Sequence, residues 1–226
     1  SVRFFSAKTR RKLMKIKIDV PDGKSGDWEV STFTVTRKDA DMFNLRQSIH
    51  CRDRHIVEGK YKKLKRKDIV VMSNTPAEIA DHYSFSNEAK RRGGDVLING
   101  LGIGVALKMV SEYVDSVTVI ELSDDVISLC APTYQNDPKI KIINADAFKW
   151  KPPKGKRYTC VWHDIWDNIE YEKNLPEMKK LHRKYGRRCD WQGSWCRAEC
   201  EYQKNKDEKE TLLLQNLGKR ISGWTE

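Results

Sequence analysis

The stretch "GGDVLINGLGIGVALKMVSEY", Gly93 to Tyr113, decides the fold. Its first part, "DVLING", is mostly apolar and predicts a buried strand, whereas "GVALKMVSEY" has apolar residues spaced as on one face of a helix. The turn between these elements contains three glycines: Gly100, Gly102 and Gly104. Glycine lets a chain turn sharply and lets its backbone approach a ligand closely at the start of a helix. We therefore expect a strand, a ligand-binding turn and a helix.

The alternation of strand and helix continues after this stretch. Strands are expected at "SVTVIEL", "KIKIINAD" and "YTCVWHDI", and a helix capped by Ser123 and stopped by Pro132 is expected at "SDDVISLCAP". Near-continuous apolar strands that alternate with helices indicate a parallel sheet covered on both faces. The predicted fold class is α/β, a Rossmann-like doubly wound parallel sheet, with no strand expected after Ile165.

The regions on either side of this core have a different character. We expect residues 1–71 to form a basic, β-rich N-terminal appendage, with strands at "KIKIDV", "WEVSTFTV" and "DIVVMS", a turn at 21–27 and a short helix at 39–49. Residues 72–170 are expected to form the Rossmann-like core. Residues 171–226 are expected to form a helical C-terminal tail.

One helix is expected to lead into the first core strand. Thr75 is the expected N-cap, Pro76 the first helical residue, and Glu78 completes a capping box. This helix is expected to continue to Gly93, where paired glycines end it.

Composition bounds the class of protein. No apolar run approaches the ~20 residues needed to span a bilayer, no signal-peptide pattern opens the chain, and the six cysteines are irregularly spaced. We therefore expect a cytoplasmic protein with reduced thiols and no membrane partner.

The net charge of +11 and the pI near 9.3 indicate either an acidic partner or a basic surface that keeps the protein in solution. The basic residues gather in "KTRRKLMKIK", "KYKKLKRK", "KRR", "KWKPPKGKR" and "HRKYGRR". These clusters either form a solvated surface or converge on one face that attracts phosphate backbones. Both interpretations stay open, because no zinc-finger, leucine-zipper or RNA-recognition signature is present.

The glycine spacing points to one class of ligand. The ordinary dinucleotide fingerprint is G-x-G-x-x-G, whereas here the spacing is G-x-G-x-G and position 105 is Val105. This compact spacing after a strand resembles the first motif of class I S-adenosylmethionine-dependent methyltransferases. The resemblance covers roughly residues 75–168 and implies S-adenosylmethionine as the cofactor.

Three further strand ends support the resemblance. Glu121 closes the second core strand, where a carboxylate can accept both ribose hydroxyls. The resemblance implies that Asp146 and the backbone of Ala147 hold the adenine, and that Asp164 lies beside the sulfonium. The implied cofactor site comprises Asn99, Gly100, Leu101, Gly102, Gly104, Glu121, Leu122, Asp146, Ala147, Asp164 and Trp166.

The segment "WHDIWDN" holds the candidate catalytic residues. Asp164 or Asp167 can accept a proton from the methyl acceptor, and His163 can act as a base. Trp166 supplies a flat wall for an aromatic substrate or for the sulfonium. The alternative for His163 follows from strand geometry, because alternate residues face opposite sides of a sheet and His163 then faces away from the site.

Within the methyltransferase class the sequence is similar to the polyamine-synthase-like branch, including its compact phage-type members. An apolar residue, Ile98, stands two positions before the first glycine, and "VTVIELSDDVISLC" looks like the ribose-binding segment of that branch. The chain differs from polyamine synthases themselves, since Asp81, His82 and Tyr83 stand where their Tyr-His-Glu motif is expected.

Some chemistries are disfavoured. No Asn/Asp-Pro-Pro-Tyr/Phe and no Pro-Cys follow the fourth core strand, which argues against amino-methylation of DNA bases and against cytosine C5 methylation. We expect no metal site, and we interpret the loosely spaced Cys196 and Cys200 as structural thiols. The segment "DWQGSW" is interpreted either as a lid or, preferably, as core anchors.

The sequence thus predicts an S-adenosylmethionine-dependent methyltransferase that acts on an oxygen or nitrogen of an unidentified acceptor, either a small molecule or a nucleic acid. The alternatives are an aminopropyltransferase that uses decarboxylated S-adenosylmethionine and a non-catalytic S-adenosylmethionine-binding protein. The C-terminal helices, or a second subunit in a homo-oligomer, are expected to complete the substrate side of the site.

Overall fold

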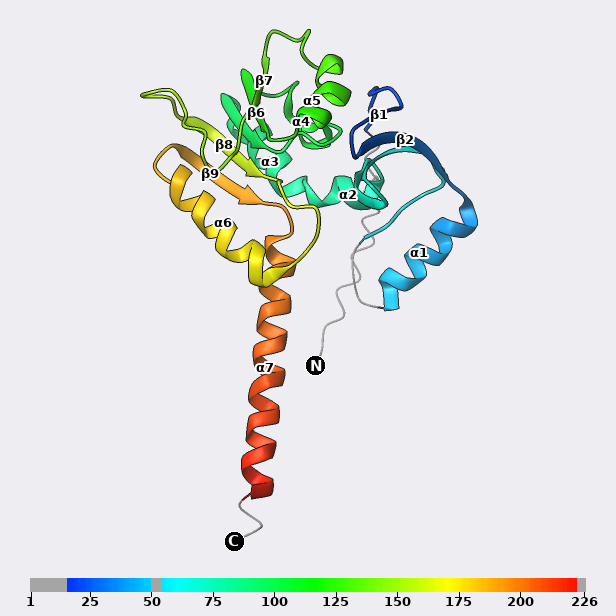
Figure 1. The fold of residues 1–226 in the computed structure, drawn as a ribbon, viewed down its shortest axis with the longest axis vertical. Helices are drawn as coiled ribbons and strands as arrows, with labels where there is room; N and C mark the ends of the chain where they lie inside the picture. The colour runs from blue at the N-terminus through cyan, green and yellow to red at the C-terminus, as the bar shows by residue number, and fades with distance from the viewer. Residues whose placement is uncertain (1–15, 50–53, 223–226) are drawn as a thin grey trace.

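The computed structural model describes residues 16–49 and 54–222, with side chains described as far as residue 215. Within these residues the chain forms two β-sheets joined and flanked by helices (Figure 1). The first basic cluster as far as Lys15, and Cys51, lie outside the described residues. In chain order the elements are β1 (Gly23–Ser25), β2 (Trp28–Val35), α1 (Arg37–Ile49), β3 (Gly59–Arg66), β4 (Ile69–Ser73), α2 (Pro76–Asp81), α3 (Tyr83–Arg92), β5 (Asp95–Asn99), α4 (Val105–Val110), β6 (Ser116–Glu121), α5 (Asp124–Cys130), η1 (Ala131–Thr133), β7 (Ile140–Asn144), β8 (Tyr158–His163), α6 (Tyr171–Tyr185), β9 (Cys189–Ser194) and α7 (Arg197–Ser222).

The larger sheet confirms the predicted α/β class. Its five strands lie in the order β7-β6-β5-β8-β9, and each neighbouring pair is parallel. The chain extends the sheet from β5 to one side through β6 and β7, and then returns to add β8 and β9 on the other side. The strand order therefore reverses between β5 and β8, and ligands of such sheets bind at the carboxyl end of that junction.

The expectation of no strand after Ile165 is wrong. Residues 189–194 form β9, which pairs in parallel with β8 at the edge of the sheet. The segment "CDWQGS" lacks the branched apolar residues of a central strand, because an edge strand has a partner on one side only. The expected helical C-terminal region therefore contains a strand between α6 and α7.

Alternation along the strands divides the core into two layers. Val96 and Ile98 of β5 pack in one hydrophobic cluster with α3, α4 and α5, whereas Leu97 packs in a second cluster with α6. On the first side, the ring of Trp162 stacks on Phe85 at a centroid distance of 5.3 Å and on Trp191 at 6.4 Å. Trp191 of the "DWQGSW" segment is thus a core anchor.

The smaller sheet is antiparallel, with the strand order β1-β2-β3-β4. The expected strands at β2 and β4 and the expected helix at α1 are confirmed. β3 coincides with the basic cluster "KYKKLKRK" and was not predicted, since its charged residues hide the alternation of Tyr61 and Leu64. The strand expected at "KIKIDV" is wrong: the described residues 16–20 pair with no strand, and Ile18 and Val20 are instead buried against the core.

The helix expected from Pro76 to Gly93 is interrupted at His82, which separates α2 from α3. Thr75 and Pro76 occupy the expected first positions, but the capping box does not close on Thr75. The Glu78 carboxylate instead accepts hydrogen bonds from the backbone N–H and the hydroxyl of Ser73. The interruption places buried His82 at the boundary between the two sheets.

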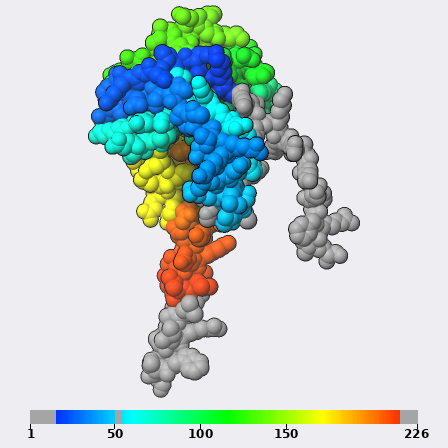
Figure 2. All heavy atoms as spheres, turned by 90° about the vertical axis from the view of Figure 1, so that its right-hand side faces the viewer, coloured from blue at the N-terminus to red at the C-terminus, as the bar shows by residue number. Residues whose placement is uncertain are grey.

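The two sheets share one core. Val30 and Leu64 of the smaller sheet belong to the same hydrophobic cluster as the strands of the larger one. The Ser25 hydroxyl donates a hydrogen bond of 2.6 Å to Asp125 at the start of α5. In Figure 2 the N-terminal strands, in blue and cyan, lie above α6, in yellow, and α1 lies at the level of α6.

The last helix, α7, leaves this body and projects away from it (Figure 1). Among the helices that the structure describes, none combines the length and apolar character that crossing a membrane requires.

Candidate active site

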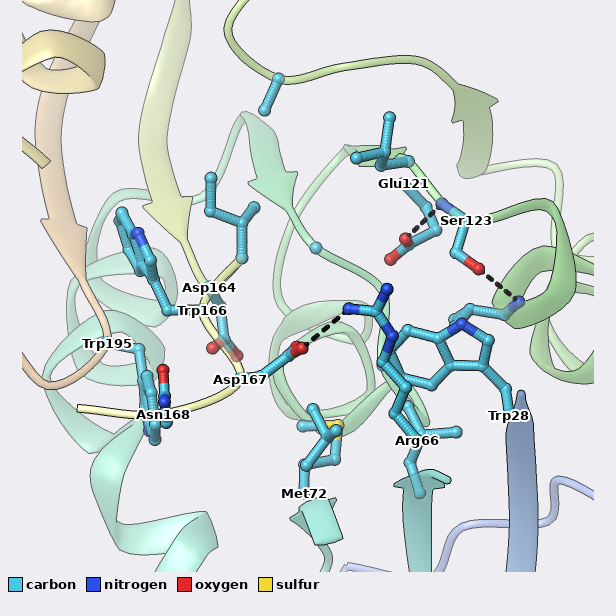
Figure 3. A pocket seen from close by; sticks show the side chains of 18 of the residues that line it. Trp28, Arg66, Met72, Glu121, Ser123, Asp164, Trp166, Asp167, Asn168 and Trp195 are labelled. Carbon is cyan, nitrogen blue, oxygen red and sulfur yellow. Dashed lines mark hydrogen bonds and ion pairs between the residues drawn. The ribbon is translucent and has the colours of Figure 1, made fainter. Parts of the chain in front are cut away.

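A cavity of about 1030 Å³ lies at the carboxyl edge of the parallel sheet, with the antiparallel sheet as its opposite wall. The ends of β5, β6, β7 and β8 each contribute residues to its lining. Figure 3 shows Asp164, Trp166 and Asp167 on one side of this cavity and Trp28 and Arg66 on the other.

Glycine is needed at two positions of the turn, because other atoms of the protein lie close to the backbone there. Gly100 has φ +100°, and a Cβ atom there would lie 1.8 Å from the carbonyl oxygen of Asp164. Gly102 has φ +50°, and a Cβ atom there would lie 2.0 Å from Sδ of Met72 in β4. The Met72 thioether also accepts a hydrogen bond of 3.2 Å from the backbone N–H of Ile103. The antiparallel sheet therefore reaches the turn directly.

Glu121 is held by the backbone on both sides. Its Oε2 accepts a hydrogen bond of 2.8 Å from Leu101 N, and its Oε1 accepts one of 2.8 Å from Ser123 N. Each carboxylate oxygen has a second acceptor site, so the group can still accept hydrogen bonds from a diol in the cavity. The Ser123 hydroxyl caps α5 by accepting from Val126 N, as expected.

Asp146 and Ala147 follow β7 and line the same cavity. The Asp146 carboxylate accepts a hydrogen bond of 2.7 Å from Phe148 N and lies 3.6 Å from Lys149 Nζ. The loop after β7, which is expected to hold the adenine, is therefore held by contacts of Asp146 with its own residues. The Asp146 side chain is partly exposed and lines the cavity.

Asp164 follows β8 and is largely buried, since its side chain is 15% exposed. Burial is the main cause that raises the pKa of its carboxyl to about 7, and the negative charges of Asp81 and Glu78 add to this effect. His82 Nε2 lies 3.9 Å from the carboxylate. Burial lowers the pKa of His82 to about 4, so this ring is neutral at pH 7 and does not offset the carboxyl charges.

Asp81 and Glu78 on α2 extend this group of buried carboxyls. Burial raises the pKa of Asp81 to about 7, even though Arg54 lies 2.8 Å from its carboxylate. Burial also raises the pKa of Glu78. Of these groups Glu78 and Asp164 line the cavity together with Glu121, Asp146 and Asp167, in a protein whose net charge is positive.

Asp167 connects the two walls of the cavity. Its carboxylate lies 3.3 Å from Nη1 of Arg66, and the Arg66 guanidinium lies 5.4 Å from the ring centroid of Trp28 (Figure 3). The Trp166 indole is fixed by a hydrogen bond of 2.7 Å from its Nε1 to Glu177. These contacts fix Trp28, Arg66 and Trp166 in the lining of the cavity.

His163 lies on the other face of β8. Its Nδ1 is 2.7 Å from the amide nitrogen of Asn99, and its Nε2 is 3.3 Å from Gln192 Oε1. The ring packs against Tyr185 and His182, and burial lowers its pKa to about 3. Strand alternation thus turns this side chain away from the cavity, as the alternative interpretation of the sequence holds.

The structure gathers most of the expected site residues around one cavity. Those that line it are Gly100, Gly102, Glu121, Leu122, Asp146, Ala147, Asp164, Trp166 and Asp167. Those outside its lining are Asn99, Leu101, Gly104 and His163. Sequence reasoning missed Trp28, Arg66, Met72, Glu78 and His82, which also line it, whereas Trp195 of the lining belongs to the segment interpreted as either a lid or core anchors.

The described cysteines are free thiols, and all five are buried. His182, the nearby histidine, is 2.9 Å from the Ser194 hydroxyl and 3.1 Å from Arg197 Nη1. No group of three potential ligand side chains in the described ranges is arranged to hold a metal ion.

Comparison with known proteins adds the family. Solved structures with a similar fold include the DhpI complex with S-adenosylhomocysteine (20% identity over 47% of this chain and 50% of that one, TM-score 0.37) and the 23S rRNA methyltransferase ErmE (17% identity, 42% and 38%, 0.33). The N-methyltransferase NodS from Bradyrhizobium japonicum WM9 is 10% identical over 49% and 60% of the two chains, with a TM-score of 0.40.

The chain spans about half the length of the first of these structures. Among curated proteins, none matches it. Residues 57–186, more than half of the chain, match the model of the family described as ribosomal RNA adenine dimethylase. The chain therefore belongs to this family of class I S-adenosylmethionine-dependent methyltransferases.

Proposed function

We propose that the protein transfers a methyl group from S-adenosylmethionine to a nitrogen of an RNA base. The observation that carries methyl transfer is the convergence of the glycine turn, Glu121, Asp146 and Asp164 on one cavity at the carboxyl edge of the sheet. The matched family is described by its action on ribosomal RNA adenine, and this description supports the choice of acceptor.

The residues present fit the cofactor. Glu121 has acceptor sites left for two ribose hydroxyls, and Asp146 with Ala147, which line the same cavity, would hold the adenine. The acidic lining complements a positively charged sulfonium. When bound, S-adenosylmethionine supplies an electrophilic methyl group.

Asp164 is the proposed proton acceptor. Its raised pKa keeps the carboxyl near half-ionised at neutral pH, which suits a general base. In its ionised form it accepts a hydrogen bond from an amino group and then the proton that this group releases. The tetrapeptide typical of amino-methylation of DNA bases is absent after β8, and Asp164 is the carboxyl at the end of this strand that lines the cavity.

The cavity suits a flat base. Trp28, Trp166 and Trp195 line it, and an aromatic ring is a stacking surface for any base. Because the inner wall is acidic, phosphates are excluded from it and a base extruded from the strand is the part that enters. Asp167 forms an ion pair with Arg66 in the same lining.

A second candidate function follows from the acidic wall itself. Glu78 and Asp164, which line the cavity, would pair with a cationic amine. In that case the acceptor is an aliphatic amine, and the transferred group is either methyl or, from decarboxylated S-adenosylmethionine, aminopropyl.

The acceptor is tested by incubating the full chain with methyl-labelled S-adenosylmethionine and either unmodified ribosomal RNA or a set of aliphatic amines. We expect label in RNA, at the base nitrogen, and none with Asp164→Asn. Label confined to the amines supports the second candidate, and aminopropyl transfer from the decarboxylated compound contradicts methyl transfer.

Glu121→Ala should weaken S-adenosylmethionine binding by about 1.5–3 kcal/mol, because the substitution removes hydrogen bonds to a charged group. Isothermal titration calorimetry measures this loss. The matched control is Glu112→Ala, an exposed carboxylate after α4, which should bind like the parent. Equal affinity of the two variants would place the ribose elsewhere.

The pH profile of kcat/KM should follow the ionisation of the Asp164 carboxyl. This carboxyl has a pKa of about 7, so the ionised base is lost as the pH falls below 7 and activity should fall with it. Asp164→Asn should lower turnover by about 10²–10⁴-fold, remove this inflection and change cofactor affinity less. Asp81→Asn should move the inflection to lower pH, because a neighbouring negative charge is removed. A profile of Asp164→Asn identical to that of the parent would exclude Asp164 as the base.

A further inference from the structure

A group of cations borders the cavity on its outer side, next to the proposed adenine position. It comprises Lys149 and Lys151 from the loop between β7 and β8, and Lys180, Arg183 and Lys184 from α6. We call this group the basic flank. We propose that the basic flank binds the phosphate backbone of RNA while the target base enters the cavity. This inference rests on the proposed RNA acceptor.

Side-chain contacts bring the two segments together. Lys184 Nζ donates a hydrogen bond of 2.8 Å to the carbonyl oxygen of Ala147, and Lys180 Nζ lies 5.1 Å from the ring centroid of Phe148. Both contacted residues line the cavity. The flank is therefore continuous with the rim of the candidate active site and is not a remote surface.

The helix directs its cations outward. Lys180, Arg183 and Lys184 are separated by three and four positions, so they share one side of α6. Leu181 and Met178 lie on the opposite side and are buried against the sheet. Lys180 and Arg183 are exposed, as Lys149 and Lys151 are on the loop.

Few acidic groups offset these charges. Among the ion pairs of the described residues, the one that involves the flank joins Lys149 to Asp146. Burial lowers the pKa of Lys184, the cations Lys151 and Lys180 lower it further, and Asp146 acts in the opposite direction. A merely solubilising surface intersperses both signs of charge, whereas like charges that crowd together favour a polyanionic partner.

The carboxylates in the cavity and the cations of the basic flank would together orient a bound RNA. Carboxylates line the inside of the cavity and cations border it, so a phosphate backbone is attracted to the flank and repelled from the interior. A base turned out of the strand carries no charge and can enter. By contrast, the neighbouring Lys156 and Arg157 already pair with Asp95 and Asp190 and are not part of the flank.

The test is equilibrium binding of the full chain to a fluorescently labelled RNA stem-loop, measured by anisotropy over a salt series. The flank variant carries Lys151→Glu, Lys180→Glu and Arg183→Glu. The control variant carries Lys38→Glu, Lys206→Glu and Lys209→Glu, which are exposed, lie outside the flank and change the net charge equally. Calorimetry with S-adenosylmethionine checks that both variants keep the cofactor site.

We expect the flank variant to bind RNA at least about tenfold more weakly than the control near 0.1 M salt. The slope of log K against log salt should become shallower by about 3, because each of the three replaced cations no longer neutralises a phosphate. An equal reduction of affinity in both variants would overturn the proposal, since net charge alone would then explain binding. Absence of RNA binding by the parent at low salt would also overturn it.

Duplex DNA of matched length separates RNA from polyanions in general. Equal affinity for the DNA, with the same weakening in the flank variant, would overturn the assignment to RNA. Failure of the proposed function has a different signature: the parent binds RNA through the flank but transfers no methyl group to it, or S-adenosylmethionine does not bind.

Discussion

The close approach of two parallel strands determines where the cavity forms. β5 and β8 are neighbours in the sheet, yet the chains that leave them turn to opposite sides. At their carboxyl ends Gly100 lies against the carbonyl oxygen of Asp164, with no room for a side chain. This contact places the glycine turn and the Asp164 carboxyl on the same rim. Glu121 then fixes the turn from β6 through the N–H group of Leu101.

Electrostatics and packing explain why the antiparallel sheet belongs to the site. It inserts Met72 against the glycine turn and brings Arg66 within 3.3 Å of Asp167. Burial of Asp164 raises the pKa of this carboxyl. A buried acidic wall can bind a sulfonium and can act as a base near neutral pH. Arg66 and Lys173 are the basic residues among the carboxylates of the lining, and further lysines and arginines of the loop after β7 and of α6 lie next to it.

The parts that sequence analysis predicted are those set by local patterns. A glycine turn, its flanking elements and the polar residues at strand ends follow one another within a few residues, so their type and their shared edge could be inferred. The long-range register of the strands could not be inferred from local patterns. For example, Trp28 and Arg66 lie opposite each other because β2 pairs with β3. The edge strand β9 was missed because its sequence is polar, and the break at His82 was missed because a continuous helical pattern covers it.

The most direct measurement is a crystal structure of the full chain with S-adenosylhomocysteine. We expect the ribose hydroxyls on Glu121, the adenine beside Asp146 and Ala147, and the sulfur facing Asp164. Density for the ligand at another surface would contradict this placement.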